Sequence, residues 1–193
     1  SSDKDKYIIG ITGEICAGKD TLVNALADQL RKDKISAEIL HSSDIVKQIF
    51  NLIDINPKRE DFHNITIYLR KHYGEDFFTR VISKKISLSK VTFILWSGLR
   101  SKHDLELLRQ YSNNLLVYIE APAEDRYRRL STRDRDKEDR TKTKEEFFRD
   151  CNKSTEAYIR MLKDKSDHII NNFDGQFKNS LDHFINIVTK VVK

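Results

Sequence analysis

A glycine-rich segment near the start of the chain places the strongest constraint on its fold. Gly13 to Thr21 matches the pattern G-x-x-x-x-G-K, with Asp20 where a serine or threonine usually follows the lysine. The apolar run from Lys6 to Thr12 precedes this segment, and leucines recur at every fourth position from Leu22 to Leu30. A turn that merely joins two elements is the simpler interpretation. A buried strand before it and an amphipathic helix after it favour a phosphate-binding loop.

The residue types of this segment suit phosphate chemistry. Glycines let the backbone curl so that its N–H groups point inward, and a helix starting near Lys19 directs its positive end the same way. Asp20 would repel phosphate unless a divalent cation intervenes or the side chain turns away from the site; we expect Mg²⁺ with Asp20 or Thr21 near it. Cys16 is interpreted as a small loop residue rather than a redox group. The predicted nucleotide-binding residues of the loop are Gly13, Glu14, Ile15, Cys16, Ala17, Gly18, Lys19, Asp20 and Thr21.

Apolar runs alternate with helical patterns along the rest of the chain. Further strands are predicted at residues 36–40, 91–96, 115–119 and 168–170, and a long charged helical region at 124–163. This alternation predicts a single α/β domain over residues 1–193, with three layers and a parallel sheet of about five strands. Ligands of such sheets bind at the carboxyl ends of the strands. The polar clusters at 13–21, 41–44, 97–101 and 171–175 follow strands and are therefore the candidate site.

Composition narrows the class of protein. The 193 residues include 35 basic and 30 acidic side chains, interspersed along the chain, which favours a solvated surface over a nucleic-acid interface. No run approaches the roughly 20 apolar residues of a membrane helix, and the start of the chain has no apolar signal core. Two cysteines, Cys16 and Cys151, are too few for a disulfide framework. We expect a cytoplasmic protein that binds neither membranes nor nucleic acid.

Several segments resemble the nucleoside monophosphate kinase-like group of P-loop kinases, in particular adenylate kinase-related and dephospho-CoA kinase-like proteins. The similar segments are Gly13 to Thr21, Ser43-Asp44, Leu69 to Gly74, Ser97 to Ser101, Arg126 to Arg133 and Asp167 to Asn172. The G-K-D-T ending of the loop is also similar to that of some viral deoxynucleoside monophosphate kinases. This resemblance implies the P-loop kinase fold, with an acceptor-binding helical insert at 44–87 and a lid at 126–150.

The resemblance also implies an activity and site residues. The terminal phosphoryl group of ATP would pass, with Mg²⁺, to a small phosphorylated acceptor, preferably a nucleoside or deoxynucleoside monophosphate. Such transfer asks chiefly for positioning and positive charge. The catalytic residues implied are Lys19, Arg129, Arg133 and Asp44; Arg129 and Asn172 would also bind nucleotide, and Asp44, Arg70, Arg100 and Arg133 would bind the acceptor.

Alternatives remain for several of these residues. Asp44 is either a helix cap or, as in dephospho-CoA kinase, a base for an acceptor hydroxyl. Arg70 and Arg100 can be ordinary surface residues. Ser97 stands where the resembled kinases usually carry an Asp that supports the metal, so a nucleotide-binding protein with little turnover is also an alternative.

Two rival functions are less favoured. Asn171 to Asp174 faintly resembles the guanine-reading loop of GTP-driven switches, but no D-x-x-G occurs in the chain. Nucleic-acid binding would rest on the basic excess, yet acidic residues accompany it and no aromatic stacking motif lies on a strand.

Overall fold

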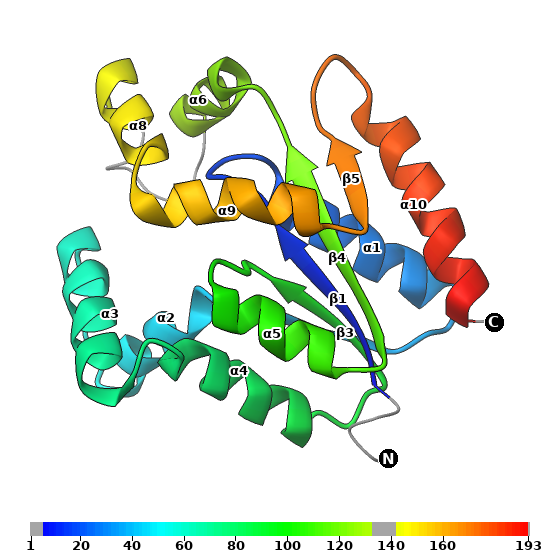
Figure 1. Ribbon diagram of the computed structural model, residues 1–193, viewed down its shortest axis with the longest axis horizontal. Helices are drawn as coiled ribbons and strands as arrows, with labels where there is room; N and C mark the ends of the chain where they lie inside the picture. The colour runs from blue at the N-terminus through cyan, green and yellow to red at the C-terminus, as the bar shows by residue number, and fades with distance from the viewer. Residues whose placement is uncertain (1–5, 133–141, 193) are drawn as a thin grey trace.

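The computed structural model describes residues 6–132 and 142–192, in which a parallel sheet lies between two layers of helices (Figure 1). This described part has five strands in the order β2-β3-β1-β4-β5, and every neighbouring pair is parallel. The predicted α/β class and sheet are thus confirmed. The strands are β1 (Tyr7–Thr12), β2 (Ala37–His41), β3 (Phe93–Ser97), β4 (Asn113–Glu120) and β5 (His168–Asn171).

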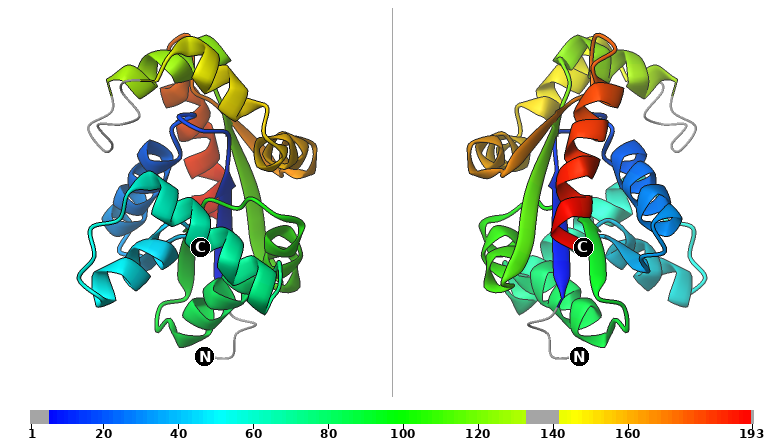
Figure 2. Two further views of the ribbon diagram at one scale, coloured as in Figure 1. Left: turned by 90° about the vertical axis from the view of Figure 1, so that its left-hand side faces the viewer. Right: turned by 90° about the vertical axis from the view of Figure 1, so that its right-hand side faces the viewer.

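Helices cover both faces of the sheet, as Figure 2 shows edge-on. One face carries α1 (Lys19–Lys32) and α10 (Phe177–Val192), and the other carries α4 (Phe77–Leu88), α5 (Lys102–Gln110) and α9 (Ser154–Lys165). Helices α2 (Asp44–Leu52) and α3 (Arg59–Tyr73) form a projecting arm with α4, and α6 (Ala123–Ser131) and α8 (Lys144–Cys151) lie beyond the carboxyl ends of the strands. None of the described helices has the length and apolar character that a membrane crossing requires.

Alternate residues of each strand pack into two separate cores. On β1, Ile9 and Ile11 join Leu22 of α1 and Phe184 of α10, whereas Ile8 joins the core under α4 and α5. All three isoleucines are fully buried. A strand buried on both faces explains why the apolar runs seen in the sequence are continuous rather than alternating.

The predicted helical region at 124–163 is divided in the structure, whose described residues there form α6, α8 and α9. Helix α6 ends at Ser131, and α8 begins at Lys144 after a new capping box. In that box the Thr143 hydroxyl accepts from the Glu146 amide at 3.2 Å, and the Glu146 carboxylate accepts from the Thr143 amide at 2.8 Å. Because a capping box satisfies amides only at a helix start, it sets a boundary that charge periodicity alone does not reveal.

A buried arginine fastens α6 to the predicted phosphate loop, the segment Gly13 to Thr21. The Arg126 side chain is only 4% exposed; its guanidinium donates to the Ile15 carbonyl at 3.2 Å and pairs with the Glu14 carboxylate at 3.3 Å. Its Nε donates to the Ala121 carbonyl at 3.1 Å, and the group lies 5.7 Å from the Phe147 ring centre of α8. Arg126 therefore connects three segments that are far apart in the sequence.

We predict that Arg126→Met destabilises the fold by about 3–5 kcal/mol, because it leaves a largely buried ion pair without one partner. The matched control is Arg128→Met on the same helix. Arg128 is 77% exposed and pairs with Asp125 on the surface of the same helix, so its loss should cost less than about 1 kcal/mol. Urea unfolding of both variants measures the difference, and equal midpoints would contradict the structural role of Arg126.

Candidate functional site

The predicted phosphate loop is a tight turn between β1 and α1. Gly18, the N-cap of α1, has φ of 110°, and a Cβ there would clash with the side-chain amide of Asn172. Cys16 has φ of 60°, which is the left-handed region that non-glycine residues rarely adopt. Strain of this kind concentrates at ligand sites, where surrounding contacts hold it in place. The loop therefore has the curled backbone expected of an anion cradle.

Lys19 folds back over this loop. Its ammonium donates to the carbonyls of Gly13 at 2.6 Å and Glu14 at 3.0 Å. Burial, and then the nearby Arg100 charge, lower the pKa of Lys19 to about 8, while Glu156 and Asp20 act in the opposite direction. A bound anion stabilises a desolvated ammonium of this kind, so the surroundings of Lys19 are a favourable place for an anionic ligand.

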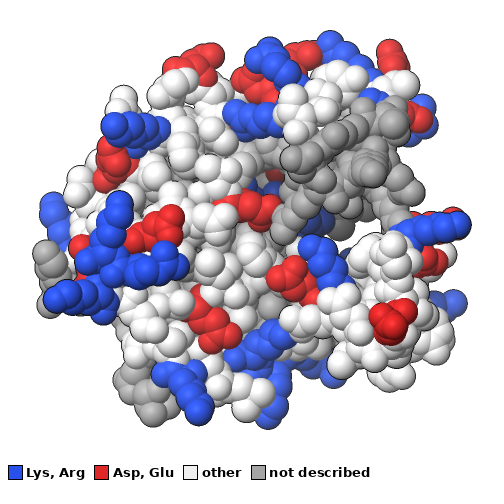
Figure 3. All heavy atoms as spheres, turned by 180° about the vertical axis from the view of Figure 1, so that it is seen from behind, with Lys and Arg blue, Asp and Glu red and all other residues white. Residues whose placement is uncertain are grey.

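A cavity of about 550 Å³ opens beside the loop at the carboxyl ends of the strands. Seen from behind, the surface is hollowed between the part that carries α6 and α8 and the part that carries α3 (Figure 3). Another cavity of about 480 Å³ lies at the amino ends of the strands, where Tyr7 and Phe93 line it. Because parallel sheets bind ligands at their carboxyl ends, the cavity beside the loop is the candidate site.

Several elements contribute to the cavity wall. The loop and α1 supply six of the predicted nucleotide-binding residues, and α6 and the end of β3 supply predicted arginines. The lining residues are Ile15, Cys16, Gly18, Lys19, Asp20, Thr21, His41, Ser43, Lys47, Ser97, Gly98, Arg100 and Arg129. Among the described residues of this lining, the cations Lys19, Lys47, Arg100 and Arg129 outnumber the one carboxylate, Asp20, which favours an anionic ligand.

Arg129 and Asn172 hold the loop from outside. The Arg129 guanidinium donates to the carbonyls of Cys16 at 3.4 Å and Ala17 at 3.2 Å, and also to the Asn172 carbonyl. The Asn172 amide donates to the Ala17 carbonyl at 2.8 Å. Arg126, which shares the predicted helix face, points into the protein instead. Arg133 lies outside the described residues, so its role in a lid at 126–150 stays a prediction.

The backbone around Arg100 is fixed by a buried carboxylate. Asp104 is 7% exposed and accepts from the Arg100 amide at 2.9 Å, the Ser101 amide at 3.1 Å and the Thr79 hydroxyl at 2.6 Å. The Thr12 hydroxyl donates to the Leu99 carbonyl at 2.8 Å. These bonds tie the segment after β3 to β1 and to α4, so that the Arg100 side chain leaves the backbone at the cavity.

Two other predicted acceptor residues, Asp44 and Arg70, are not among the described residues that line the cavity. Asp44 is the first residue of α2, whereas Ser43 occupies the N-cap, so the interpretation of Asp44 as the cap is wrong. The Asp44 carboxylate lies 3.5 Å from the Lys47 ammonium. Arg70 on α3 lies over the Phe78 ring at 5.6 Å, and its buried Nε has no hydrogen-bond partner among the described residues.

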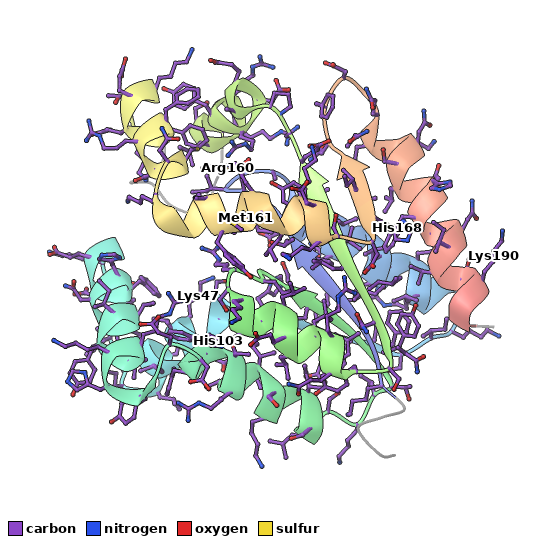
Figure 4. All side chains as sticks on the ribbon, in the orientation of Figure 1. Lys47, His103, Arg160, Met161, His168 and Lys190 are labelled. Carbon is purple, nitrogen blue, oxygen red and sulfur yellow. The ribbon has the colours of Figure 1, made fainter. Side chains whose placement is uncertain are left out.

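The sequence places His41 in the candidate cluster 41–44 without giving it a role, and it does not single out Lys47 or Glu156. His41 ends β2, and its Nδ1 lies 3.8 Å from the Asp20 carboxylate. Lys47 projects from the first turn of α2 (Figure 4), and Glu156 of α9 contacts the loop. Lys47 lies in the helix that follows β2, so the rule that places ligands after strands could have been extended to it. Glu156 has no such sequence signal.

The residues present suit a magnesium–nucleotide complex. Asp20, Thr21 and Ser97 line the cavity together and offer carboxylate and hydroxyl oxygens, the donors that Mg²⁺ prefers. The curled loop and the Lys19 ammonium match the needs of a polyphosphate chain. Within residues 6–132 and 142–192, no group of three or more His, Cys, Asp or Glu residues is placed to hold a metal ion by itself.

Comparisons with known proteins define the fold. No family model matches the chain. A UPF0200 protein of Staphylothermus marinus is 23% identical over 133 residues, and that alignment spans 67% of this chain and 65% of the relative.

Solved structures of shikimate kinases are similar along almost the entire chain. The enzyme from Acinetobacter baumannii, in complex with shikimate, matches with a TM-score of 0.57 and 18% identity over 97% of this chain and 95% of that one. The enzyme from Bacteroides thetaiotaomicron matches with a TM-score of 0.55 and 16% identity over 95% and 98% of the two chains. The protein therefore has the three-layer fold of the P-loop kinases.

Proposed function

We propose that this protein is an ATP-dependent phosphotransferase, and that its acceptor is a small phosphorylated molecule, preferably a nucleoside or deoxynucleoside monophosphate. The observation that carries this proposal is the cavity in which the loop ammonium of Lys19 and three further cations converge. Phosphoryl transfer needs such convergence, because charge spreads over the transferred oxygens in the transition state.

The donor side rests on the loop. Its amides and Lys19 would hold the phosphates of ATP, and Asn172 and Arg129 keep the loop carbonyls turned away from them. Asp20 and Thr21 would hold Mg²⁺, which neutralises phosphate charge when bound. Closure of a lid at 126–150, with Arg133, would exclude water that competes with the acceptor.

The acceptor side rests on Arg100 and Lys47, which lie beyond the loop in the same cavity. A guanidinium suits an anionic acceptor because it can donate two parallel hydrogen bonds to one phosphate. A hydroxyl acceptor, as in dephospho-CoA kinase, needs a base, and its candidate Asp44 is outside the cavity lining and close to Lys47. This arrangement favours a phosphate acceptor over a hydroxyl acceptor.

A coupled ADP-release assay tests the reaction, with a panel of nucleoside monophosphates and dephospho-CoA. We expect ADP release that depends on the acceptor. Its rate should fall at least about 100-fold in Lys19→Ala, because the variant lacks the ammonium charge next to the transferred phosphoryl group. Lys32→Ala, an exposed lysine at the other end of α1, is the matched control and should keep full activity. ADP release at one rate with and without acceptors would favour a plain ATPase or a switch.

Arg100→Ala tests the acceptor side. We expect the KM for the acceptor to rise about 10- to 100-fold while the KM for ATP stays within about twofold, since a charged hydrogen bond contributes about 1.5–3 kcal/mol. Lys47→Ala should shift the same constant. Lys102→Ala is the control, because that lysine is 73% exposed and does not line the cavity. An equal rise in the KM for the acceptor and the KM for ATP would contradict the assignment of Arg100.

The depressed pKa of Lys19, about 8, predicts a pH dependence of nucleotide binding. The ammonium is charged below this pKa, so triphosphate affinity should be steady from about pH 7 to 7.5 and should fall as the pH rises through 8 and above. Calorimetric titration measures this. Lys19→Met should bind the triphosphate weakly, with an affinity that does not change with pH. Cys16→Ser is the control for the adjacent thiol and should keep the wild-type pH profile.

A further inference from the structure

Helix α9 places a carboxylate on the phosphate loop. The Glu156 carboxylate accepts a hydrogen bond from the Ile15 amide at 3.2 Å, across 141 residues of sequence. Such amides are the groups by which a phosphate loop binds its ligand. The Glu156 side chain is partly buried, and α9 passes close to the loop in the ribbon view (Figure 1).

The neighbouring carboxylate of Glu14 has a different environment. It is paired with Arg126 at 3.3 Å and with Arg160 at 3.0 Å, and Arg160 also donates to the Cys151 carbonyl at 2.7 Å. Arg160 lies on the side of α9 that faces α6 (Figure 4). Helix α9 thus contacts the loop through two opposite charges, of which Arg160 binds a carboxylate and Glu156 binds an amide.

The contacts of Lys19 show which part of the phosphate loop Glu156 contacts. The Lys19 ammonium donates to the Glu14 carbonyl at 3.0 Å, and Glu156 accepts from the amide of the next residue, Ile15, so both side chains bind the same peptide unit of the loop. In loops of this type the lysine reaches the outer phosphates of the nucleotide. A carboxylate near this ammonium and on a loop amide therefore lies at the outer-phosphate end of the cradle.

We propose that Glu156 determines how the site distinguishes nucleoside triphosphates from diphosphates. Its carboxylate occupies a donor that the terminal phosphate requires, and the two anions repel each other at short range. A triphosphate must displace Glu156, whereas a diphosphate leaves it in place. Since Glu156 is in the first turn of α9, this displacement transmits the presence of the terminal phosphate to α9 and to α8, which precedes it. The inference rests on the proposed function, because it requires nucleotide at the loop.

The test compares the affinity of Glu156→Gln for a non-hydrolysable ATP analogue and for ADP, with Mg²⁺ at pH 7. Glutamine keeps an oxygen that can accept from Ile15 and removes the charge. We expect about tenfold tighter binding of the analogue and less than about twofold change for ADP, so that their affinity ratio rises about tenfold. Asp164→Asn, an exposed carboxylate on the same helix, changes the net charge equally and should leave the ratio unchanged.

The possible outcomes separate this inference from the proposed function. If wild-type binding depends on Lys19 but Glu156→Gln leaves the ratio unchanged or lowers it, the inference fails and the proposed function stands. If neither nucleotide binds in a Lys19-dependent manner, both fail. Glu156→Ala provides a second variant with the same expected direction should the glutamine variant fold poorly, as circular dichroism would show.

Hydrogen exchange provides an independent measurement on the wild-type protein. The ATP analogue should increase amide exchange in the first turns of α9 relative to the nucleotide-free protein, and ADP should not. Identical exchange in α9 with the analogue and with ADP would overturn the proposed displacement.

Discussion

The rest of the site depends on the orientation of one short stretch of backbone. An anion cradle needs its amides turned inward, and the carbonyls of the same peptides must then find donors on the outside. Side chains from three parts of the chain meet this need. Lys19 donates to the Gly13 and Glu14 carbonyls, Arg126 to Ile15, Arg129 to Cys16 and Ala17, and Asn172 to Ala17. The loop conformation is thus specified by α6 and by the end of β5 as much as by its own glycines.

This dependence explains which parts of the structure follow from sequence. The strands are short apolar runs buried on both faces, and the loop has a recognisable pattern, so the sheet and the cavity at its carboxyl ends were predicted. Arg126 and Arg129 are one helical turn apart, and periodicity places both on one face. Their different positions depend on Glu14 and Phe147, which attract Arg126 into the interior, and such tertiary contacts leave no pattern in the local sequence.

The acceptor side shows the same coupling over longer distances. Asp104 holds the Arg100 amide and the Thr79 hydroxyl with its two oxygens, so the segment after β3 and the helix α4 share one buried carboxylate. A shift of α4 would therefore move the backbone that carries Arg100. Because α4 belongs to the projecting arm with α2 and α3, the arm and the cavity are mechanically connected through Asp104, and the sequence alone does not reveal this connection.

The cavity also accounts for two departures from the pattern of the resembled kinases. Those kinases usually carry a hydroxyl after the loop lysine and an Asp at the end of the third strand; here Asp20 follows the lysine and Ser97 ends β3. Both side chains line one cavity, and His41, beside Ser97 in the sheet, lies 3.8 Å from Asp20. The usual pattern of those kinases and the pattern of this chain each supply one carboxylate and one hydroxyl oxygen to the same cavity. In the proposed site the two departures exchange positions and leave unchanged the charge of the residues that would hold Mg²⁺, because what attracts Mg²⁺ is the local set of oxygens and not the strand that carries them.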